Sequence, residues 1–230
     1  ETETWQKLIR VLTHEIMNSI TPVASLTSTL SRMVRDTKEE YDGKLDEEST
    51  QEIQKALDTI HKRSEGLLHF VNTYRSLTKI PKPNFDIVKA RDLFDSVKPL
   101  MNKNLTDNNI RLTTQVDSDH LEFYADIKLI EQVLINLVTN AIHALENQEQ
   151  GQIQLKAYRS KRGRPTLQVH DNGRGILQDV LDKIFIPFFT TKPKGSGIGL
   201  SLSKQIMRLH GGSITAASEP EKGTTFTLTF

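Results

Sequence analysis

The sequence predicts an α+β protein with two parts. An N-terminal helical hairpin is expected to form a dimeric four-helix bundle, and an α/β sandwich domain follows it. Apolar residues recur at steps of three and four through the first part, which is the period of amphipathic helices. In the second part, short β-type runs alternate with helical runs, which predicts helices layered on a sheet. Pro81 and Pro83 stop the helical pattern, so we expect domains at residues 1–80 and 85–230.

The bulk composition excludes several classes of protein. The 230 residues carry 30 Lys and Arg against 29 Asp and Glu, a net charge of +1, so nothing predicts binding to nucleic acid. The chain has no cysteine, which excludes disulfides and thiolate metal sites. No apolar run approaches the roughly 20 residues that span a bilayer, and no signal peptide is visible. Because residues 1–4 already have helical composition, we expect the natural chain to begin upstream.

The hairpin is predicted from two apolar stripes with a polar segment between them. Residues 36–48 are polar and contain Asp42-Gly43, which predicts a turn. The second stripe alternates steps of four and three, the heptad spacing of a bundle seam. Two helices with single stripes do not seal a core, so we expect two chains to pair; the alternative is that the stripe packs on the second domain. The stripe positions are Trp5, Leu8, Leu12, Ile16, Ile20, Val23, Leu26, Leu30 and Met33, then Ile53, Leu57, Ile60, Ser64, Leu67, Val71 and Tyr74.

The second domain is predicted to be a mostly antiparallel sheet with helices on one face, because its strands are linked as hairpins between helical runs. The expected strands are 110–116, 121–125, 152–158, 166–170, 213–217 and 224–230. The expected helices are 91–104, 128–146 and 196–210.

His14 has the position of an exposed nucleophile on the first helix. It lies two residues from both Leu12 and Ile16, about 200° around the helix from each, so it faces away from the apolar stripe. Glu15 is placed to hold the proton of one imidazole nitrogen, which leaves the other free to attack phosphorus. Asn18 shares the face of His14 and is suited to orient a water. Taken alone, an exposed histidine on a helix is ordinary surface, and only the downstream motifs favour a chemical role.

Asn136 and Asn140 lie four residues apart inside the apolar helix 128–146. Two amides on one face of a buried helix are costly unless they are satisfied. Their neutral oxygens suit a magnesium ion that is already held mostly by phosphates and waters; the alternative is helix packing through amide hydrogen bonds. His143, one turn further, is placed either to touch a phosphate or to lie on the surface.

Asp171 ends a predicted strand, and Gly173 and Gly175 follow it closely. An aspartate in this position can accept a hydrogen bond from an exocyclic amine such as adenine N6. The two glycines let a ring approach the backbone closely. Alone, this short string also fits a plain turn.

A second glycine block, Gly195, Gly197 and Gly199 followed by Leu200, opens the predicted helix 196–210. Exposed amides at a helix N-terminus, together with the helix dipole, form a cradle for phosphate. The spacing matches neither the Rossmann nor the Walker phosphate-binding pattern.

Residues 184–192, between the two glycine blocks, are predicted to form a lid. The segment is rich in phenylalanine and ends at Lys192, which is available for phosphate. The alternative is that the phenylalanines belong to the core.

These blocks, in this order and over essentially the whole chain, closely resemble those of the sensor histidine kinases of bacterial two-component systems. The resemblance implies a homodimeric helical hairpin and a catalytic ATP-binding domain of the gyrase, Hsp90, histidine kinase and MutL superfamily. Many relatives place a proline five residues after the histidine, whereas this chain has Ser19 there and its proline is Pro22, so a bend is expected later, if at all. The matching segments are His14–Pro22 (phosphoacceptor box), Asn136–Ala144 (N box), Asp171–Gly175 (G1 box), Phe185–Lys192 (F box), Gly195–Leu200 (G2 box) and Gly223–Phe226 (closing strand).

The resemblance implies ATP and Mg²⁺ as ligands, autophosphorylation on His14, and transfer to an aspartate of a response-regulator receiver domain, with phosphatase action on that regulator. It also implies a cytoplasmic region of a sensor that is anchored in a membrane through an upstream segment. The alternatives are a nucleotide-binding dimeric signalling scaffold without transfer activity and an ATP-driven clamp, which needs no phosphoacceptor. The expected site residues are the catalytic His14, Glu15 (general base) and Asn18 (phosphatase-assisting amide), the magnesium-binding Asn140 and Asn136, the adenine-reading Asp171 and Thr224 (through a water), and the nucleotide-contacting His143, Gly173, Gly175, Lys192, Gly195, Gly197, Gly199 and Leu200.

Overall fold

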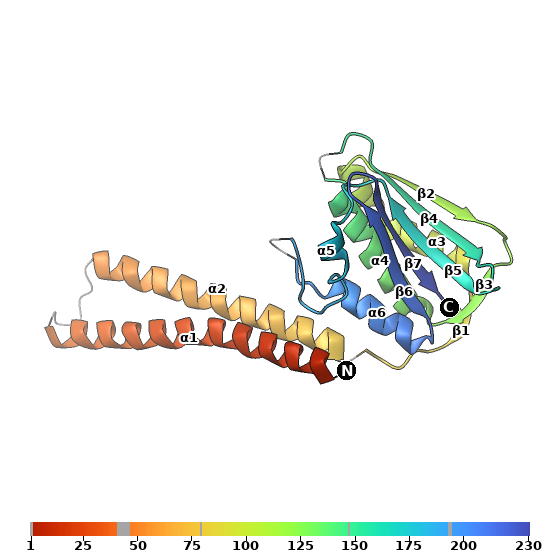
Figure 1. The fold of residues 1–230 in the computed structure, drawn as a ribbon. Helices are drawn as coiled ribbons and strands as arrows, with labels where there is room; N and C mark the ends of the chain where they lie inside the picture. The colour runs from red at the N-terminus through yellow and green to blue at the C-terminus, as the bar shows by residue number, and fades with distance from the viewer. Residues whose placement is uncertain (1, 41–46, 79, 147, 193–194) are drawn as a thin grey trace. The chain divides into compact units, whose positions relative to one another are not determined.

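The fold is that of a computed structural model, in which the chain divides into two compact units, Glu1–Thr78 and Lys79–Phe230. The first unit is a pair of helices, and the second combines helices with two sheets (Figure 1). No helix among the described residues has a stretch long and apolar enough to cross a membrane. The described residues are 2–40, 47–78, 80–146, 148–192 and 195–230.

The first unit consists of α1 (Thr2–Glu40) and α2 (Glu47–Thr78), which pack against each other along their length (Figure 1). α1 continues through Pro22 without a break in its assignment. The predicted turn at 36–48 is too long, because 36–40 lack glycine and proline and stay helical, and α2 already begins at Glu47. Asp42-Gly43 lies outside the described residues.

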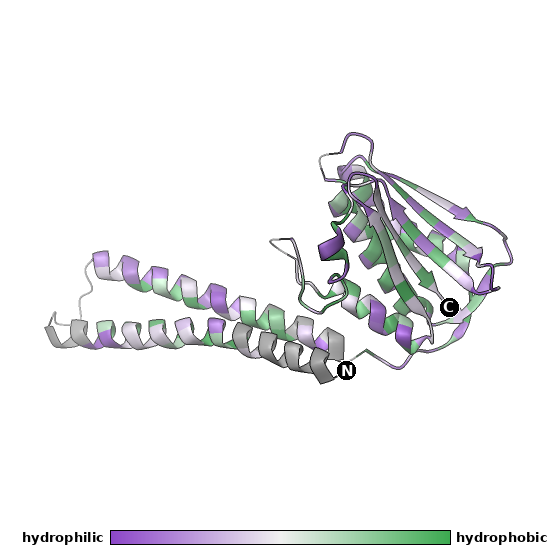
Figure 2. Cartoon of the chain, viewed as in Figure 1, coloured by the Kyte–Doolittle hydropathy of each residue, from purple (hydrophilic) through white to green (hydrophobic). Residues whose placement is uncertain are grey.

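Among the described side chains of the hairpin, none is fully buried. Several seam residues are about half exposed in the single chain: Ile20 (47%), Leu57 (47%) and Val71 (45%). In Figure 2, α2 alternates short hydrophobic and hydrophilic stretches along its length. A hairpin with this pattern has an apolar side that its own two helices do not cover.

The second unit is built on a five-stranded sheet in the order β2-β4-β5-β7-β6. The β2–β4 pair is parallel and the other three pairs are antiparallel, so the predicted mostly antiparallel sheet is confirmed. The central β5 pairs with β7, and this pairing sets Asp171 opposite Thr224. The strands are β2 (Arg111–Val116), β4 (Gln152–Arg159), β5 (Pro165–Asp171), β6 (Ser213–Glu219) and β7 (Gly223–Thr229).

The helices α3 (Ala90–Asp107), α4 (Ile127–Ala144) and α6 (Gly199–Leu209) cover one face of this sheet (Figure 1). α4 is the central one, since it contacts α3, α6 and three strands, and it is mostly hydrophobic in Figure 2. Asp126 caps its N-terminus by accepting the N–H groups of Lys128 (3.0 Å) and Leu129 (3.2 Å). This layer forms the core of the molecule and carries much of the cavity wall described below.

Two short elements were not predicted. β1 (Asp86–Lys89) pairs with β3 (Glu122–Ala125) in a separate two-stranded sheet, and α5 (Gln178–Leu181) lies just before the segment 184–192 that is predicted to be a lid. The four residues of β1 do not alternate between apolar and polar side chains, the pattern that predicts a strand, and only Val88 is buried.

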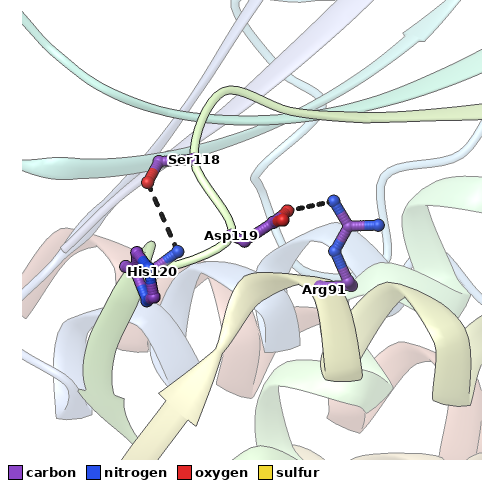
Figure 3. A network of polar contacts seen from close by, with 4 residues as sticks. All are labelled: Arg91, Ser118, Asp119 and His120. Carbon is purple, nitrogen blue, oxygen red and sulfur yellow. Dashed lines mark hydrogen bonds and ion pairs between the residues drawn. The ribbon is translucent and has the colours of Figure 1, made fainter.

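Polar contacts tie the loop before β3 to the first turn of α3 (Figure 3). The Arg91 guanidinium pairs with the Asp119 carboxylate, and the His120 N–H donates to the Ser118 hydroxyl at 3.3 Å. At the neighbouring residues, the Ala90 N–H donates to the Leu121 carbonyl at 3.0 Å. The loop is thereby held against the start of α3.

Candidate functional site

A cavity of about 680 Å³ opens in the second unit, between α4, the ends of β5 and β7, and the segment that runs into α6. Its size suits a small organic ligand. All of the predicted nucleotide-contacting residues line it except Gly173. The predicted residues on its wall are Asn136, Asn140, His143, Asp171, Gly175, Lys192, Gly195, Gly197, Gly199, Leu200 and Thr224.

Asp171 lines the cavity and is 2% exposed. Its carboxylate accepts the Gly173 N–H at 2.9 Å and is also held by the backbone N–H of Thr224. Burial raises the pKa of Asp171 above its ordinary value, against the opposing effects of the Gly173 N–H, of His170 and of the Thr224 N–H. The result is an oriented, desolvated acceptor that faces a cavity.

The two glycines after Asp171 lie in close contacts that leave no room for a side chain. Gly175 has φ of +71°, and a Cβ there would lie 2.1 Å from the Glu219 carbonyl oxygen. A Cβ on Gly173 would meet the Ala144 carbonyl oxygen at 2.8 Å. Gly173 does not line the cavity, but its N–H donates to the Asp171 carboxylate and fixes its direction.

Asn136 and Asn140 share a face of α4 but have different partners. The Asn136 amide nitrogen donates to the Ser203 hydroxyl of α6 at 3.0 Å, and a Cβ on Gly199 would lie 2.0 Å from the Asn136 side-chain oxygen. The Asn140 side-chain oxygen instead accepts from the Lys192 ammonium at 2.9 Å. Asn136 thus holds two helices together, whereas Asn140 contacts a cationic group at the cavity.

Lys192 also lies 3.2 Å from the His143 imidazole, so it joins two side chains of α4. Burial lowers the pKa of Lys192 most; Glu146 opposes this shift and Arg174 adds to it. The predicted lid lysine is therefore at the cavity, together with Asn140 and His143.

The helix after the second glycine block begins later than predicted. α6 starts at Gly199 rather than Ser196, so Gly195 and Gly197 precede it. Gly197 has φ of +67°, and a Cβ there would lie 2.4 Å from the Phe188 carbonyl carbon, a conformation and a contact that no periodic pattern reveals. Gly199 and Leu200, in the first turn of α6, still line the cavity.

The phenylalanines of 184–192 serve different purposes. Phe185 is partly buried and packs against the core, and Phe189 lines the cavity. Phe188 has φ of +64°, and its N–H donates to the Gly197 carbonyl at 2.9 Å. One face of the cavity is thus a segment of irregular backbone that is anchored to the glycine block.

Sequence reasoning missed several residues on the cavity wall. None of them was singled out by its residue type, although eight lie inside segments that the sequence analysis identified: Ala144, Arg174, Ser196 and Phe226 in the motif blocks, and Ile184, Phe189, Thr190 and Thr191 in the predicted lid. The residues missed include Ala144, Arg174, Ile176, Leu177, Val180, Ile184, Phe189, Thr190, Thr191, Ser196, Pro220, Glu221 and Phe226.

Comparisons with known proteins agree with this geometry. Residues 125–230 match the family described as histidine kinase-, DNA gyrase B-, and HSP90-like ATPase. The chain is 29% identical over 222 residues to the signal transduction histidine-protein kinase AtoS of Escherichia coli K12, covering 96% of this chain and 34% of AtoS. It is 32% identical to the solved catalytic domain of the histidine kinase ThkA, with a TM-score of 0.57, covering 64% of this chain and 97% of that domain.

The chain belongs to the sensor histidine kinases. A further solved structure, that of the histidine kinase ThkA in complex with the response regulator protein TrrA, is 24% identical and has a TM-score of 0.65. It covers all of this chain and 64% of ThkA, and it supports the fold of both units. The chain spans about a third of the length of AtoS.

The segment predicted to hold the phosphoacceptor, His14–Pro22, lies on α1 in the first unit. The side chains of His14 and Glu15 are outside the part of the chain that the structure describes, so the predicted outward direction of His14 stays a prediction. Asn18 is exposed on the same helix. Among the described residues, no group of three His, Cys, Asp or Glu side chains is arranged to hold a metal ion.

Proposed function

We propose that this sensor histidine kinase binds ATP with Mg²⁺ in the cavity of its second unit and transfers the γ-phosphoryl group to His14. From His14 the group passes to an aspartate of a response-regulator receiver domain, and the chain also acts as a phosphatase toward that regulator. The observation that carries the proposal is the arrangement of the cavity. A buried acceptor, Asp171, lines the cavity together with Lys192, Asn140 and the first residues of α6.

The part of the cavity wall that holds Asp171 suits the adenine ring. A buried carboxylate that is held by two backbone N–H groups has a fixed direction, and it accepts a hydrogen bond from an exocyclic amine. Apolar side chains such as Ile176, Val180 and Ile184 border the same cavity and can cover the flat faces of a ring. The proposed adenine site therefore combines one polar anchor with apolar walls.

The first turn of α6 and Lys192 suit the triphosphate. Free N–H groups at a helix N-terminus and an ammonium group both favour anionic oxygens. Asn140 and Asn136 are the residues that would hold Mg²⁺, which neutralises triphosphate charge when it is bound. Because Lys192 now donates to the Asn140 oxygen, cation binding at this amide requires Lys192 to leave it and frees the ammonium for a phosphate oxygen.

Phosphoryl transfer asks little covalent work of the protein, so its contribution is mainly positioning and charge neutralisation. Glu15 is proposed to hold the imidazole proton of His14 in the tautomer that leaves the other nitrogen free to attack. Asn18 is proposed to orient a water against the regulator's phosphorylated aspartate. The half-exposed seam of the hairpin supports the homodimer, and the ThkA–TrrA complex supports a receiver-domain partner.

The decisive experiment is phosphorylation with γ-labelled ATP, followed by a test for label that is acid-labile and base-stable. The unmodified chain should incorporate label, and His14→Ala should lose it while keeping nucleotide binding, since acceptor and cavity belong to different units. His61→Ala is the matched control, because His61 is a second histidine of the hairpin and its side chain is exposed. Label that persists in His14→Ala would overturn the acceptor assignment. Nucleotide binding with no labelling of the unmodified chain would favour the scaffold.

Two further substitutions separate the two proposed reactions. Glu15→Ala should slow autophosphorylation by about 10²- to 10⁴-fold, the usual effect of removing a general base. Asn18→Ala should slow dephosphorylation of the regulator much more than autophosphorylation. Equal slowing of both reactions by both substitutions would show that the two residues only support the helix around His14.

A further inference from the structure

The hydroxyl group of Ser218 on β6 contacts two residues of the cavity wall, Ile176 and Thr224, and the Gly223 carbonyl. Its oxygen accepts the Ile176 N–H at 2.8 Å. It also lies 2.9 Å from the Gly223 carbonyl oxygen and 3.0 Å from the Thr224 hydroxyl. Thr224 is 3% exposed, lines the cavity and lies opposite Asp171 in the β5–β7 ladder.

The three contacts fix where each hydroxyl proton lies. A carbonyl oxygen has no proton, so the contact between Gly223 and Ser218 requires the Ser218 proton. Ser218 then has only lone pairs for its other partners, so the contact with Thr224 requires the Thr224 proton. The Thr224 hydroxyl is thereby left with lone pairs alone toward the cavity. It can accept a hydrogen bond from a ligand but cannot donate one.

We propose that Ser218 is a positioning residue that makes the cavity select a 6-amino purine over a 6-oxo purine. This inference rests on the proposed function, which puts the base beside Asp171. An exocyclic amine supplies protons directly to two acceptors, the Asp171 carboxylate and the Thr224 hydroxyl. The hydrogen bonds then run in one direction, from the amine to Thr224, to Ser218 and to the Gly223 carbonyl, and bonds aligned in this way strengthen one another. A 6-oxo group has no proton to begin this chain.

The test compares ATP with ITP, which carries oxygen in place of the amine and lacks the additional amino group of GTP. Equilibrium titration should show that Ser218→Ala weakens ATP binding by about five- to tenfold, the effect of one neutral hydrogen bond. ITP binding should change much less, because the freed Thr224 hydroxyl can rotate and donate to the 6-oxo group. The dissociation constant of ITP divided by that of ATP should therefore fall by about fivefold. Ser218→Thr, which keeps the hydroxyl, should retain the ratio.

A double-mutant cycle tests the alternative that Ser218 acts only by holding Ile176 in place. Thr224→Val keeps the shape of Thr224 but removes its hydroxyl, so Ser218→Ala should leave the ratio unchanged in that background. Ser213→Ala, the same substitution on an exposed residue of the same strand, should change neither affinity. Thermal unfolding of each variant confirms that the ratio is measured on folded protein.

Equal weakening of ATP and ITP by Ser218→Ala would overturn this inference and leave ATP binding intact as a function. An ITP-to-ATP ratio of dissociation constants that falls equally with and without the Thr224 hydroxyl would overturn it as well. Failure of the unmodified chain to bind ATP would instead remove the proposed function, and this inference with it.

Discussion

The helical hairpin and the mixed unit bury their apolar residues to different degrees. In the mixed unit, Leu137 of α4 and Leu155 of β4 are 0% exposed, enclosed between a layer of helices and a sheet. In the hairpin, Leu57 and Val71 of the seam remain 47% and 45% exposed. Two layers enclose a core within one chain, whereas two narrow helices cannot. The mixed unit should therefore be stable by its own packing, and the hairpin should depend on a second copy.

The largest effect is expected from charges in the seam. Replacing Leu57 and Val71 together by Asp should give monomeric or unfolded hairpins, because two chains would have to bury unpaired carboxylates between them. Light scattering measures the mass in solution, and circular dichroism measures the loss of helix. The mixed unit should keep its own unfolding transition.

The matched control places the same added charge outside the seam. Thr59 and Gly66 are exposed on α2, and nothing lies within 4 Å of a Cβ built on Gly66. Replacing both by Asp should leave the mass unchanged. A folded monomer for the unmodified chain would contradict the comparison from which this prediction starts.

The layers of the fold were predictable from sequence because their signals are local and periodic. The strands 152–158 and 166–170 alternate in burial, and helix 128–146 carries a continuous apolar face, so the predicted elements agree with β4, β5 and α4. β1 was not predictable, since it is a strand only through its pairing with β3, more than thirty residues away. Pairing over such a distance leaves no periodic pattern in the strand itself.

The candidate site shows the same division. The motif residues Asp171, Asn140 and Lys192 were found because their types and spacing point to a ligand. Ser218 was not found, because a serine on an edge strand has no distinguishing spacing, and its three hydrogen bonds come from tertiary structure. The start of α6 was misplaced because glycines carry no side chain whose period could mark it.

The next largest effect distinguishes two asparagines on one helix. Asn140→Ala should lower magnesium-dependent ATP affinity by about 100-fold, since uncompensated triphosphate charge costs several kcal/mol. Its effect on unfolding without nucleotide should be small. Asn136→Ala should lower the free energy of unfolding by about 1 kcal/mol through loss of the hydrogen bond to Ser203, with a milder loss of affinity. Titration calorimetry and thermal unfolding measure the two effects. Equal losses in both measurements would show that these side chains do not have separate roles.

Asp171→Asn should weaken ATP binding by about 10- to 100-fold, the range for a hydrogen bond to a charged group. The same substitution should not destabilise the unliganded mixed unit at neutral pH. Burial raises the pKa of Asp171, so the folded state holds this proton more tightly than the unfolded state. The stability that Asp171 contributes is present below the ordinary aspartate pKa and is lost as pH rises through the raised value.

Removing the charge should therefore be neutral or stabilising, and ATP affinity should fall as pH is lowered through the raised pKa of Asp171. Measuring affinity and unfolding as functions of pH tests both statements on one pair of proteins. A variant that loses stability at neutral pH while keeping its ATP affinity would show that Asp171 is structural.

The smallest effect is expected at the surface of the mixed unit. Arg91 and Asp119 form an ion pair, but their side chains are 55% and 72% exposed, so water screens the attraction (Figure 3). A double-mutant cycle with Arg91→Ala and Asp119→Ala should give a coupling energy of about 0.5 kcal/mol or less, which salt should reduce further. Leu137→Ala, in the buried helix layer, should cost roughly 2–5 kcal/mol by comparison. If the exposed pair contributed more to the free energy of unfolding than Leu137, the stability of this unit would come from its surface contacts. The contrast in core burial would then not explain a difference in stability between the two units.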